Sequence, residues 1–209
     1  MTPVPDAAPA PDAPPPLILA STSRYRRELL ERFRLPFTSV APDVDETPLP
    51  GEAPAALALR LARAKAEAVS ALHPHAIVIG SDQVADVDGH AIGKPGTHER
   101  AVAQLRGMRG RQVVFQTAVA VVRADRCIHL AELAPVTVRF RDLADDEIEH
   151  YLRLEEPYDC AGSAKSETLG IALLSAIESD DPTALIGLPL IRTANLLRAA
   201  GLDPVRHAR

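Results

Sequence analysis

Aromatic side chains are scarce in this sequence of 209 residues, and acidic residues outnumber basic ones. Tryptophan is absent and aromatic residues make up 3%, which excludes the rows of exposed rings on which many single-strand nucleic acid binders stack bases. The 23 Lys and Arg face 28 Asp and Glu, and the net charge of -5 disfavours non-specific attraction to duplex phosphates or anionic lipid. We therefore expect no nucleic acid polymer and no membrane as a partner, whereas a small anionic ligand in a local basic pocket remains compatible.

Cysteines and long apolar runs are also few. The two cysteines, Cys127 and Cys160, lack CxxC spacing, so we expect reduced, buried, structural thiols. No run reaches the roughly 18 apolar residues of a membrane span, and residues 1–16 lack the basic start and apolar core of a signal peptide. We expect a cytoplasmic protein.

The length fits one domain, and 46% hydrophobic with 24% charged residues is typical of a globular chain. Seven of the 19 prolines fall within residues 1–16, where fixed φ angles and missing N–H donors disfavour packing. We expect a disordered extension at 1–16 and a single domain at 17–209.

Short apolar runs alternate with amphipathic segments along the domain, which predicts both strands and helices. Strands are predicted at 17–20, 37–40, 77–80, 112–123 and 127–140, with a hairpin at 84–92 around Asp88-Gly89. Helices are predicted from the capping residues Ser21, Thr22 and Ser23 to about residue 34, and at 54–72, 97–108, 145–155 and 189–200. Early alternation followed by a long antiparallel hairpin favours an α/β fold with a mixed sheet and flanking helices.

The turn from Ser21 to Arg27 places three hydroxyls and three guanidinium groups where a strand leads into a helix N-terminus. Free backbone N–H groups and the positive dipole end of such a helix can hold phosphate oxygens. An ordinary N-cap with solvated arginines is the alternative. The chain has no G-x-x-x-x-G-K-[ST], which excludes a P-loop.

Lys65 and Asp82 are polar residues in apolar surroundings. Lys65 lies about 40° from Leu61 and about 20° from Leu72 around the helix, within the stripe that also holds Leu57, so it must snorkel to solvent or meet an anion. Asp82 follows the strand at 77–80, and the carboxyl ends of such strands carry the sites of α/β sheets. It is a candidate metal ligand or general base, or else it caps a turn.

Glu46 and Lys94 lie in loops. Glu46 could join Asp82 in holding a hard divalent cation, or belong to a solvated acidic loop. Lys94, in Gly93-Lys94-Pro95, adds a cation next to a fixed turn, with a simple turn as the alternative. The histidines show no HExxH or Cys/His ligand spacing, so a zinc site is not expected.

Six ordered blocks of sequence resemble the Maf family of nucleotide pyrophosphatases. They are LILASTSRYRRELL, PDVDE, LRLARAKAEAV, VIGSDQV, IGKP and the segment from CAGSAKSETLG to IGLPL. The resemblance runs from Leu17 almost to the C-terminus and implies a mixed α/β fold similar to that of inosine triphosphate pyrophosphatases, with a cleft between two lobes. It also implies hydrolysis of a nucleoside triphosphate substrate to the monophosphate and pyrophosphate, a divalent metal (Mg²⁺ or Mn²⁺), and a homodimer.

The resemblance also implies roles for individual residues. Carried over by motif, the phosphate contacts are Ser21, Arg26, Lys65 and Lys94. By the same resemblance, Glu46 stands at the position of a metal ligand. Asp82 stands at the position of a metal ligand that also accepts the proton of the attacking water.

Within the family, the chain resembles the branch that acts on 7-methyl-GTP. The branch that acts on dTTP and UTP usually has an arginine in place of Tyr25, SDT in place of Ser81-Asp82-Gln83, and a glutamine in place of Glu167. Tyr25, Gln83 and Glu167 are thus the specificity candidates. N7-methylguanine is cationic and stacks on aromatic faces, and a carboxylate accepts its N1–H and N2–H bonds.

Two departures and two alternatives accompany this resemblance. Arg24 replaces the usual proline, and Tyr25 stands where similar proteins often have tryptophan, which weakens stacking. Hydrolysis of dTTP, UTP or another noncanonical nucleotide is the alternative among enzymes. A non-catalytic, nucleotide-sensing regulator of septum formation is the alternative of another class, which Asp82 and Glu46 disfavour because a sensor needs no water-activating carboxylate.

Overall fold

The computed structural model describes residues 14–209. Its strands are β1 (Leu17–Ala20), β2 (Thr38–Val40), β3 (Ile77–Val87), β4 (His90–Ile92), β5 (Gln112–Arg123), β6 (Ile128–Phe140) and β7 (Leu174–Glu178). Its α-helices are α1 (Arg24–Glu31), α2 (Pro54–Leu72), α3 (His98–Met108), α4 (Asp145–Glu155), α5 (Leu190–Ala199) and α6 (Pro204–His207). Short 3₁₀ helices are η1 (Ala124–Arg126), η2 (Ala161–Ser163), η3 (Leu169–Leu173) and η4 (Ala184–Ile186). Within residues 14–209, no helix is long and apolar enough to cross a membrane.

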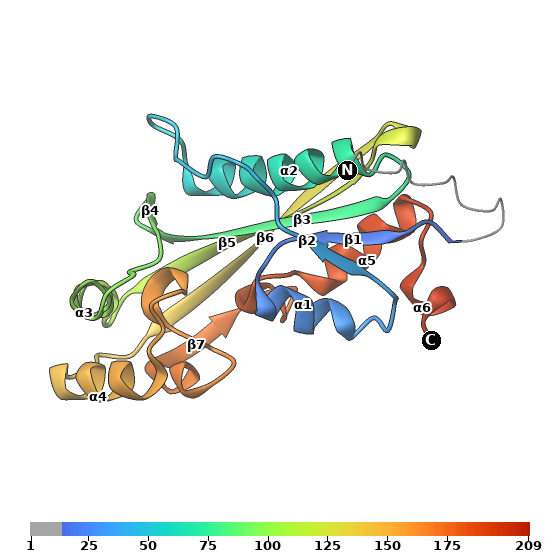
Figure 1. Cartoon of the computed structure of the whole chain (residues 1–209). Helices are drawn as coiled ribbons and strands as arrows, with labels where there is room; N and C mark the ends of the chain where they lie inside the picture. The colour runs from blue at the N-terminus through green and yellow to red at the C-terminus, as the bar shows by residue number, and fades with distance from the viewer. Residues whose placement is uncertain (1–13) are drawn as a thin grey trace, which may run out of the picture.

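The strands form one mixed sheet in the order β2-β1-β3-β5-β6-β7, with β4 paired to β3 (Figure 1). Strand β1 runs parallel to β2 and β3, and the other pairs are antiparallel. The predicted mixed α/β sheet with flanking helices is confirmed. Of the extension predicted at 1–16, residues 1–13 lie outside the described part of the chain. Pro16 is described, and its carbonyl accepts a hydrogen bond of 2.8 Å from the Ile77 N–H.

Helix α2 covers one face of the sheet, and α1 and α5 cover the other (Figure 1). Ile18 and Ala20 of β1 pack in the core cluster that contains α2, whereas Leu17 and Leu19 pack in the cluster that contains α1 and α5. Since both faces are buried, β1 is apolar at every position, as expected for a strand between two helical layers.

The long strands β3, β5 and β6 extend beyond β1 and form a second lobe with α3 and α4 (Figure 1). Val87, Phe115 and Val138 pack there against Leu105 of α3 and Leu152 of α4. The two lobes thus share three strands, while each has its own helices and its own core.

Strand β3 corrects the prediction that a strand ends at residue 80. It continues to Val87, although its parallel neighbour β1 stops at Ala20, opposite Gly80. The polar residues Ser81, Asp82 and Gln83 continue the strand because their main chain pairs with β5 and their side chains find polar partners.

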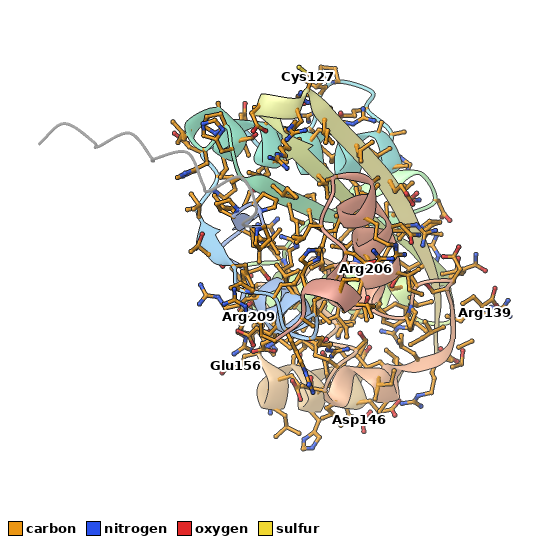
Figure 2. All side chains as sticks on the ribbon, turned by 90° about the vertical axis from the view of Figure 1, so that its right-hand side faces the viewer. Cys127, Arg139, Asp146, Glu156, Arg206 and Arg209 are labelled. Atoms are coloured by element: carbon orange, nitrogen blue, oxygen red, sulfur yellow. The ribbon has the colours of Figure 1, made fainter. Side chains whose placement is uncertain are left out.

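Two burial predictions are wrong. Leu72 is 74% exposed, because the buried face of α2 runs through Leu57, Leu61, Lys65 and Val69 and leaves Leu72 outside it. Cys127 is exposed, because it lies in the turn that joins β5 to β6 at the end of the hairpin (Figure 2). Cys160 is only half-buried, and both cysteines are free.

Element boundaries differ by a few residues elsewhere. Helix α1 ends at Glu31 rather than near residue 34, and its N-cap is Ser23. Pro189 is the N-cap of α5 rather than its first helical residue. Strand β7 and the 3₁₀ helix η4 were not predicted.

Candidate active site

One cavity of about 780 Å³ opens between the two lobes. All the residues that the sequence singles out as site residues line it, namely Ser21, Tyr25, Arg26, Glu46, Lys65, Asp82, Gln83, Lys94 and Glu167. They come from separate segments of the chain, so their convergence is a property of the fold. Their individual roles stay predictions.

The N-terminus of α1 contributes Ser21 and Arg26. Ser21 Oγ accepts hydrogen bonds from Ser23 N (3.1 Å) and Arg26 Nη1 (3.5 Å), and Arg26 Nε donates to the carbonyl of Gly187 (2.9 Å). Burial lowers the pKa of Arg26, and the charges of Asp82 and Glu46 oppose this shift. The guanidinium is held from two sides, which suits a fixed phosphate-binding cation.

Lys65 joins the two acidic site residues. Its Nζ lies 2.6 Å from Asp82 Oδ1 and 2.7 Å from Glu46 Oε1. Lys65 and Asp82 are buried, whereas the Glu46 side chain is 56% exposed. Burial raises the pKa of Glu46, but the hydrogen bond and charge of Lys65, with Lys94 and Arg26, outweigh it and lower the pKa below its usual value. Lys65 therefore pairs with acidic side chains, which is one of the two outcomes expected for it.

Gly80 allows α2 to approach β3 closely enough for this pairing. A Cβ on Gly80 would lie 2.2 Å from the Ala62 carbonyl oxygen and 2.6 Å from Ala66 N, so only glycine fits. Helix α2 thereby rests on the strand main chain, with Lys65 opposite Asp82.

Arg60 fixes the loop that carries Glu46, a role that sequence reasoning missed. Its Nη2 donates to the Thr47 carbonyl (3.1 Å), and its guanidinium pairs with Glu52 through Nε (2.7 Å). The hydrogen bond from Arg60 lowers the pKa of Glu52 to about 2. The acidic loop is thus tied to the same helix that carries Lys65.

The segment around η4 supplies main-chain carbonyls to the site, which sequence reasoning also missed. The Gly187 carbonyl accepts hydrogen bonds from Ser81 Oγ (3.0 Å) and Arg26 Nε (2.9 Å). Gln83 Nε2 lies within hydrogen-bond distance of Thr117 Oγ1 (2.9 Å) and of the Ala184 and Leu185 carbonyls (both 3.0 Å). The amide nitrogen of Gln83 is therefore directed at the protein.

Asp181 anchors this segment from within the core. The residue is fully buried, and its carboxylate accepts hydrogen bonds from the main-chain N–H groups of Ile191 (2.9 Å) and Arg192 (3.2 Å) at the start of α5 and from Thr183 Oγ1 (2.9 Å). A carboxylate at a helix N-terminus is well placed because it satisfies free N–H groups and faces the positive end of the dipole.

The remaining rim of the cavity carries Arg24, Tyr25, Asp159, Cys160 and Glu167. Burial raises the pKa of Tyr25 and of Glu167, and raises that of Cys160 to about 12, so this thiol stays protonated and is a poor nucleophile. Asp159 is a further acid that the sequence analysis did not single out.

Lys94 lies in the loop between β4 and α3, on the other lobe from Lys65. Its side chain is exposed, and its charge contributes to the lowered pKa of Glu46. The loop is tied down by Gly96 N, which donates to the Tyr158 carbonyl (3.0 Å), and by Gln104 Nε2, which donates to the Gly93 carbonyl (3.0 Å). Cations from both lobes thus face the same cavity.

The donor set of Glu46 and Asp82 fits a hard divalent cation. Both carboxylates bond Lys65 Nζ, so their charges lie close together and a cation would bind beside this amine. Over residues 14–209, no group of three or more His, Cys, Asp or Glu forms a metal cage. Mg²⁺ is commonly held by one or two carboxylates together with substrate phosphates, so two protein ligands are sufficient for such a site.

Several known proteins have sequences similar to this chain. The sequence model of the family described as Maf-like protein matches residues 16–200. A 7-methyl-GTP pyrophosphatase of Polaromonas sp. is 68% identical over 187 residues, covering 90% of this chain and 85% of that protein. Proteins of the same name from Albidiferax ferrireducens (63% over 186 residues; 89% and 94%) and Bordetella pertussis (63% over 196 residues; 93% and 97%) are also similar. The chain therefore belongs to the Maf family.

Proposed function

We propose that this protein hydrolyses 7-methyl-GTP to 7-methyl-GMP and pyrophosphate. The observation that carries the proposal is one cavity that holds the cations Arg26, Lys65 and Lys94, the carboxylates of Glu46 and Asp82 bonded to Lys65, the Tyr25 ring and the acid Glu167. The names of the similar proteins support the same substrate. The cations suit a triphosphate, and the ring and acid suit a cationic base.

The triphosphate would be bound by Arg26, Lys65 and Lys94, with the hydroxyl of Ser21. Arg26 is held in place by Ser21 Oγ and the Gly187 carbonyl, so little side-chain entropy is lost when it contacts a phosphate. Lys94 reaches from the other lobe. Negative charge that develops on the leaving pyrophosphate would be stabilised by these fixed cations.

Asp82 would act as the general base. Its Oδ1 is bonded to Lys65, and none of the described residues donates a hydrogen bond to its Oδ2, which is left for a water molecule. The water loses a proton to Asp82 as its oxygen forms a bond to the α-phosphorus. The bond between the α-phosphorus and the bridging oxygen breaks, and pyrophosphate leaves with that electron pair.

Glu46 and Asp82 would hold a divalent metal, Mg²⁺ or Mn²⁺. When bound, the metal would neutralise phosphate charge and polarise phosphoryl oxygens. Glu46 lies on an exposed loop and Asp82 in a rigid strand, so one ligand is adaptable and the other is fixed.

Tyr25, Gln83 and Glu167 would recognise the base. Tyr25 offers a stacking face, and the Glu167 carboxylate can accept the N1–H and N2–H of 7-methylguanine. Because the amide nitrogen of Gln83 is committed to the protein, its Oε1 is the atom available to the base.

We further propose that the protein works as a homodimer in the cytoplasm, where nucleoside triphosphates are made and used. Exposed apolar side chains such as Leu169, Ile171 and Ile177 support an interface, since contact with a second copy would remove them from water. Light scattering coupled to size-exclusion chromatography tests the dimer, and a monomer at micromolar concentration would contradict it.

Pyrophosphate release measured across 7-methyl-GTP, GTP, dTTP, UTP and ITP tests the proposed reaction. We expect the highest kcat/KM with 7-methyl-GTP, by about 10- to 100-fold over GTP, because a cationic base gains cation–π stacking and charge-assisted hydrogen bonds. Equal kcat/KM for GTP and 7-methyl-GTP would contradict the substrate. Binding without turnover of any nucleotide would favour a sensing role.

The variant Asp82→Asn tests the general base, and Asp86→Asn is its matched control. Both aspartates lie on β3, but Asp86 is outside the cavity and bonds Gln116 and Gly89. We expect Asp82→Asn to keep the fold and to lower kcat by about 100-fold or more, the usual scale for a lost general base, with Asp86→Asn unaffected. A folded, fully active Asp82→Asn would rule out this role.

A further inference from the structure

Arg24 and Tyr25 begin helix α1 at the rim of the cavity, and their side chains contact each other. The guanidinium carbon of Arg24 lies 4.7 Å from the centroid of the Tyr25 ring. Its Nη2 also donates a hydrogen bond of 2.9 Å to the Tyr25 hydroxyl. A cation within about 6 Å of a ring centroid is attracted by the negative face of the ring. The stacking residue of the cavity therefore already holds a cation, supplied by its neighbour in sequence.

Two acids share these surroundings. Asp159 and Glu167 line the same cavity as Arg24 and Tyr25. The hydrogen bond to Tyr25, together with the charge of Asp159, raises the pKa of Arg24. Burial raises the pKa of Glu167, and the charge of Arg24 is among those that oppose this shift. The Tyr25 ring thus contacts the exposed guanidinium, and the two carboxylates of the same cavity favour a positive charge there.

We propose that Arg24 sets the substrate selectivity of this cavity by occupying the cation position on Tyr25 that a positively charged base would take. This role rests on the proposed function, because Tyr25 must stack on the base. A methylated base that stacks on the face covered by Arg24 must displace the guanidinium or share the ring with it, and two like charges a few Å apart repel each other. A neutral base meets no such repulsion. Arg24 therefore reduces the preference for 7-methyl-GTP over GTP.

Substitution of Arg24 separates this role from phosphate binding. We expect Arg24→Gln to raise the ratio of kcat/KM for 7-methyl-GTP over GTP by about two- to five-fold, the scale of one exposed cation–π contact. Arg24→Lys keeps the charge and is expected to change the ratio less. Calorimetry with the nucleosides 7-methylguanosine and guanosine gives the same comparison without phosphates, and Arg24→Gln is expected to tighten binding of the methylated nucleoside alone.

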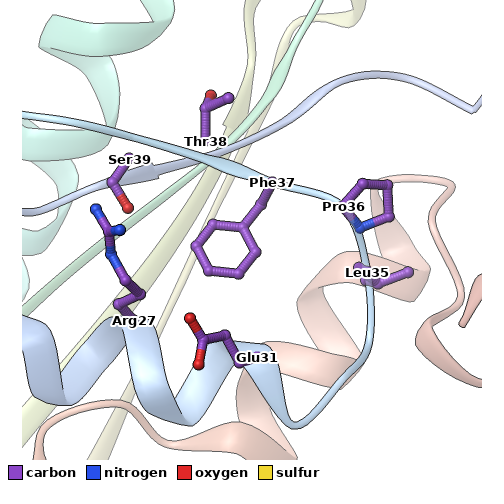
Figure 3. Close-up of a pocket in the computed structure, with 7 residues that line it drawn as sticks. All are labelled: Arg27, Glu31, Leu35, Pro36, Phe37, Thr38 and Ser39. Atoms are coloured by element: carbon purple, nitrogen blue, oxygen red, sulfur yellow. The ribbon is translucent and has the colours of Figure 1, made fainter. Parts of the chain in front are cut away.

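Arg27→Gln is the matched control. Arg27 lies on the same helix and is exposed, but it lines a separate groove of about 430 Å³ beside β2, where it lies near Phe37 and Ser39 (Figure 3). We expect this variant to leave unchanged both the ratio of kcat/KM for 7-methyl-GTP over GTP and the relative affinity for the two nucleosides.

Two results would overturn the role of Arg24. One is an unchanged or lower selectivity in Arg24→Gln. The other is weaker pyrophosphate binding in that variant with unchanged nucleoside binding, which would make Arg24 a phosphate contact. Failure of the wild-type protein to hydrolyse 7-methyl-GTP would contradict the proposed function alone, because the nucleoside affinities still measure the effect of Arg24.

Discussion

Glu167 is the cavity residue whose ionisation is expected to control the choice of base. Burial raises its pKa, so its carboxylate gains a proton at a higher pH than an ordinary glutamate does. Protonation removes the negative charge that attracts a cationic base. We expect the ratio of kcat/KM for 7-methyl-GTP over UTP to fall as the pH is lowered from neutral into the mildly acidic range. Steady-state kinetics with both substrates over this range measures the effect.

Glu167→Gln keeps the shape of the side chain and removes the charge. We expect it to lower the ratio at neutral pH by about 10-fold, the scale of one charge-assisted hydrogen bond, and to make the ratio independent of pH. Glu156→Gln changes an exposed carboxylate outside the cavity and serves as the control. An equal loss for both substrates in Glu167→Gln would place Glu167 outside base recognition.

Lys65 and Asp82 could be identified from the sequence as candidate site residues, but their contact could not. Lys65 was identifiable because a cation on an apolar helix face requires an anion or an escape to solvent. Asp82 was identifiable as a carboxylate after an apolar run. Their pairing was not, because it depends on the contact between α2 and the main chain at Gly80, and a glycine in a strand has several possible causes.

At the scale of elements, the segment from η4 to α5 positions the site through its main chain. Gly187 has a φ of 126°, in the region that favours glycine, and this conformation directs its carbonyl to Arg26 and Ser81. Gly187→Ala would strain this backbone or shift the carbonyl. We expect KM for the triphosphate to rise by about 10-fold, as for loss of about 1.4 kcal/mol of binding, while kcat changes less.

Gly201→Ala is the control for strain alone. Gly201 also has a positive φ, of 93°, and it follows α5 with no atom within 4 Å of an added Cβ. Both variants are expected to lower the melting temperature, since alanine is disfavoured at positive φ. Only Gly187→Ala is expected to raise KM. A similar KM in the two variants would mean that the Gly187 carbonyl does not position Arg26.

The contribution of this segment could not have been read from the sequence. A main-chain carbonyl has no residue type, so the roles of Ala184, Leu185 and Gly187 depend only on backbone direction. Strand β7 was not predicted because it is an edge strand of five residues, LSAIE, which is too short for a clear alternation of apolar and polar side chains. By contrast, helix α2 and the β5–β6 hairpin were predicted to within a residue or so, because long periodic segments carry a strong signal.

At the scale of the whole molecule, the cavity lies where the lobes share the strands β3, β5 and β6. Lys65 belongs to the lobe of α2, and Lys94 and Glu167 belong to segments packed with α3 and α4. A nucleotide that contacts Lys65 in one lobe and Lys94 or Glu167 in the other would connect the two lobes, each of which has its own hydrophobic core. Binding to the folded state alone raises stability by mass action.

This linkage predicts a metal-dependent rise in thermal stability with pyrophosphate, a ligand without a base. If Glu46 and Asp82 hold Mg²⁺ and Arg26 and Lys94 hold phosphate, pyrophosphate with Mg²⁺ is expected to raise the melting temperature by several degrees. A free pyrophosphate concentration of about 100 times Kd corresponds to about 2.7 kcal/mol of added free energy of unfolding. A chelator is expected to remove most of this rise. Differential scanning calorimetry measures it, and hydrogen exchange is expected to slow at 93–97 in one lobe and 44–48 in the other.

Glu46→Gln then separates metal binding from phosphate binding. The variant keeps the length of the side chain and weakens a ligand for a hard cation. We therefore expect it to lose the Mg²⁺-dependent part of the stabilisation. We expect it to keep the part that pyrophosphate provides when a chelator is present. Asp43→Asn removes an exposed acid from the same loop outside the cavity and is expected to behave as the wild type. If Glu46→Gln retains the full Mg²⁺ effect, Glu46 is not a metal ligand, and its bond to Lys65 instead holds the acidic loop against α2.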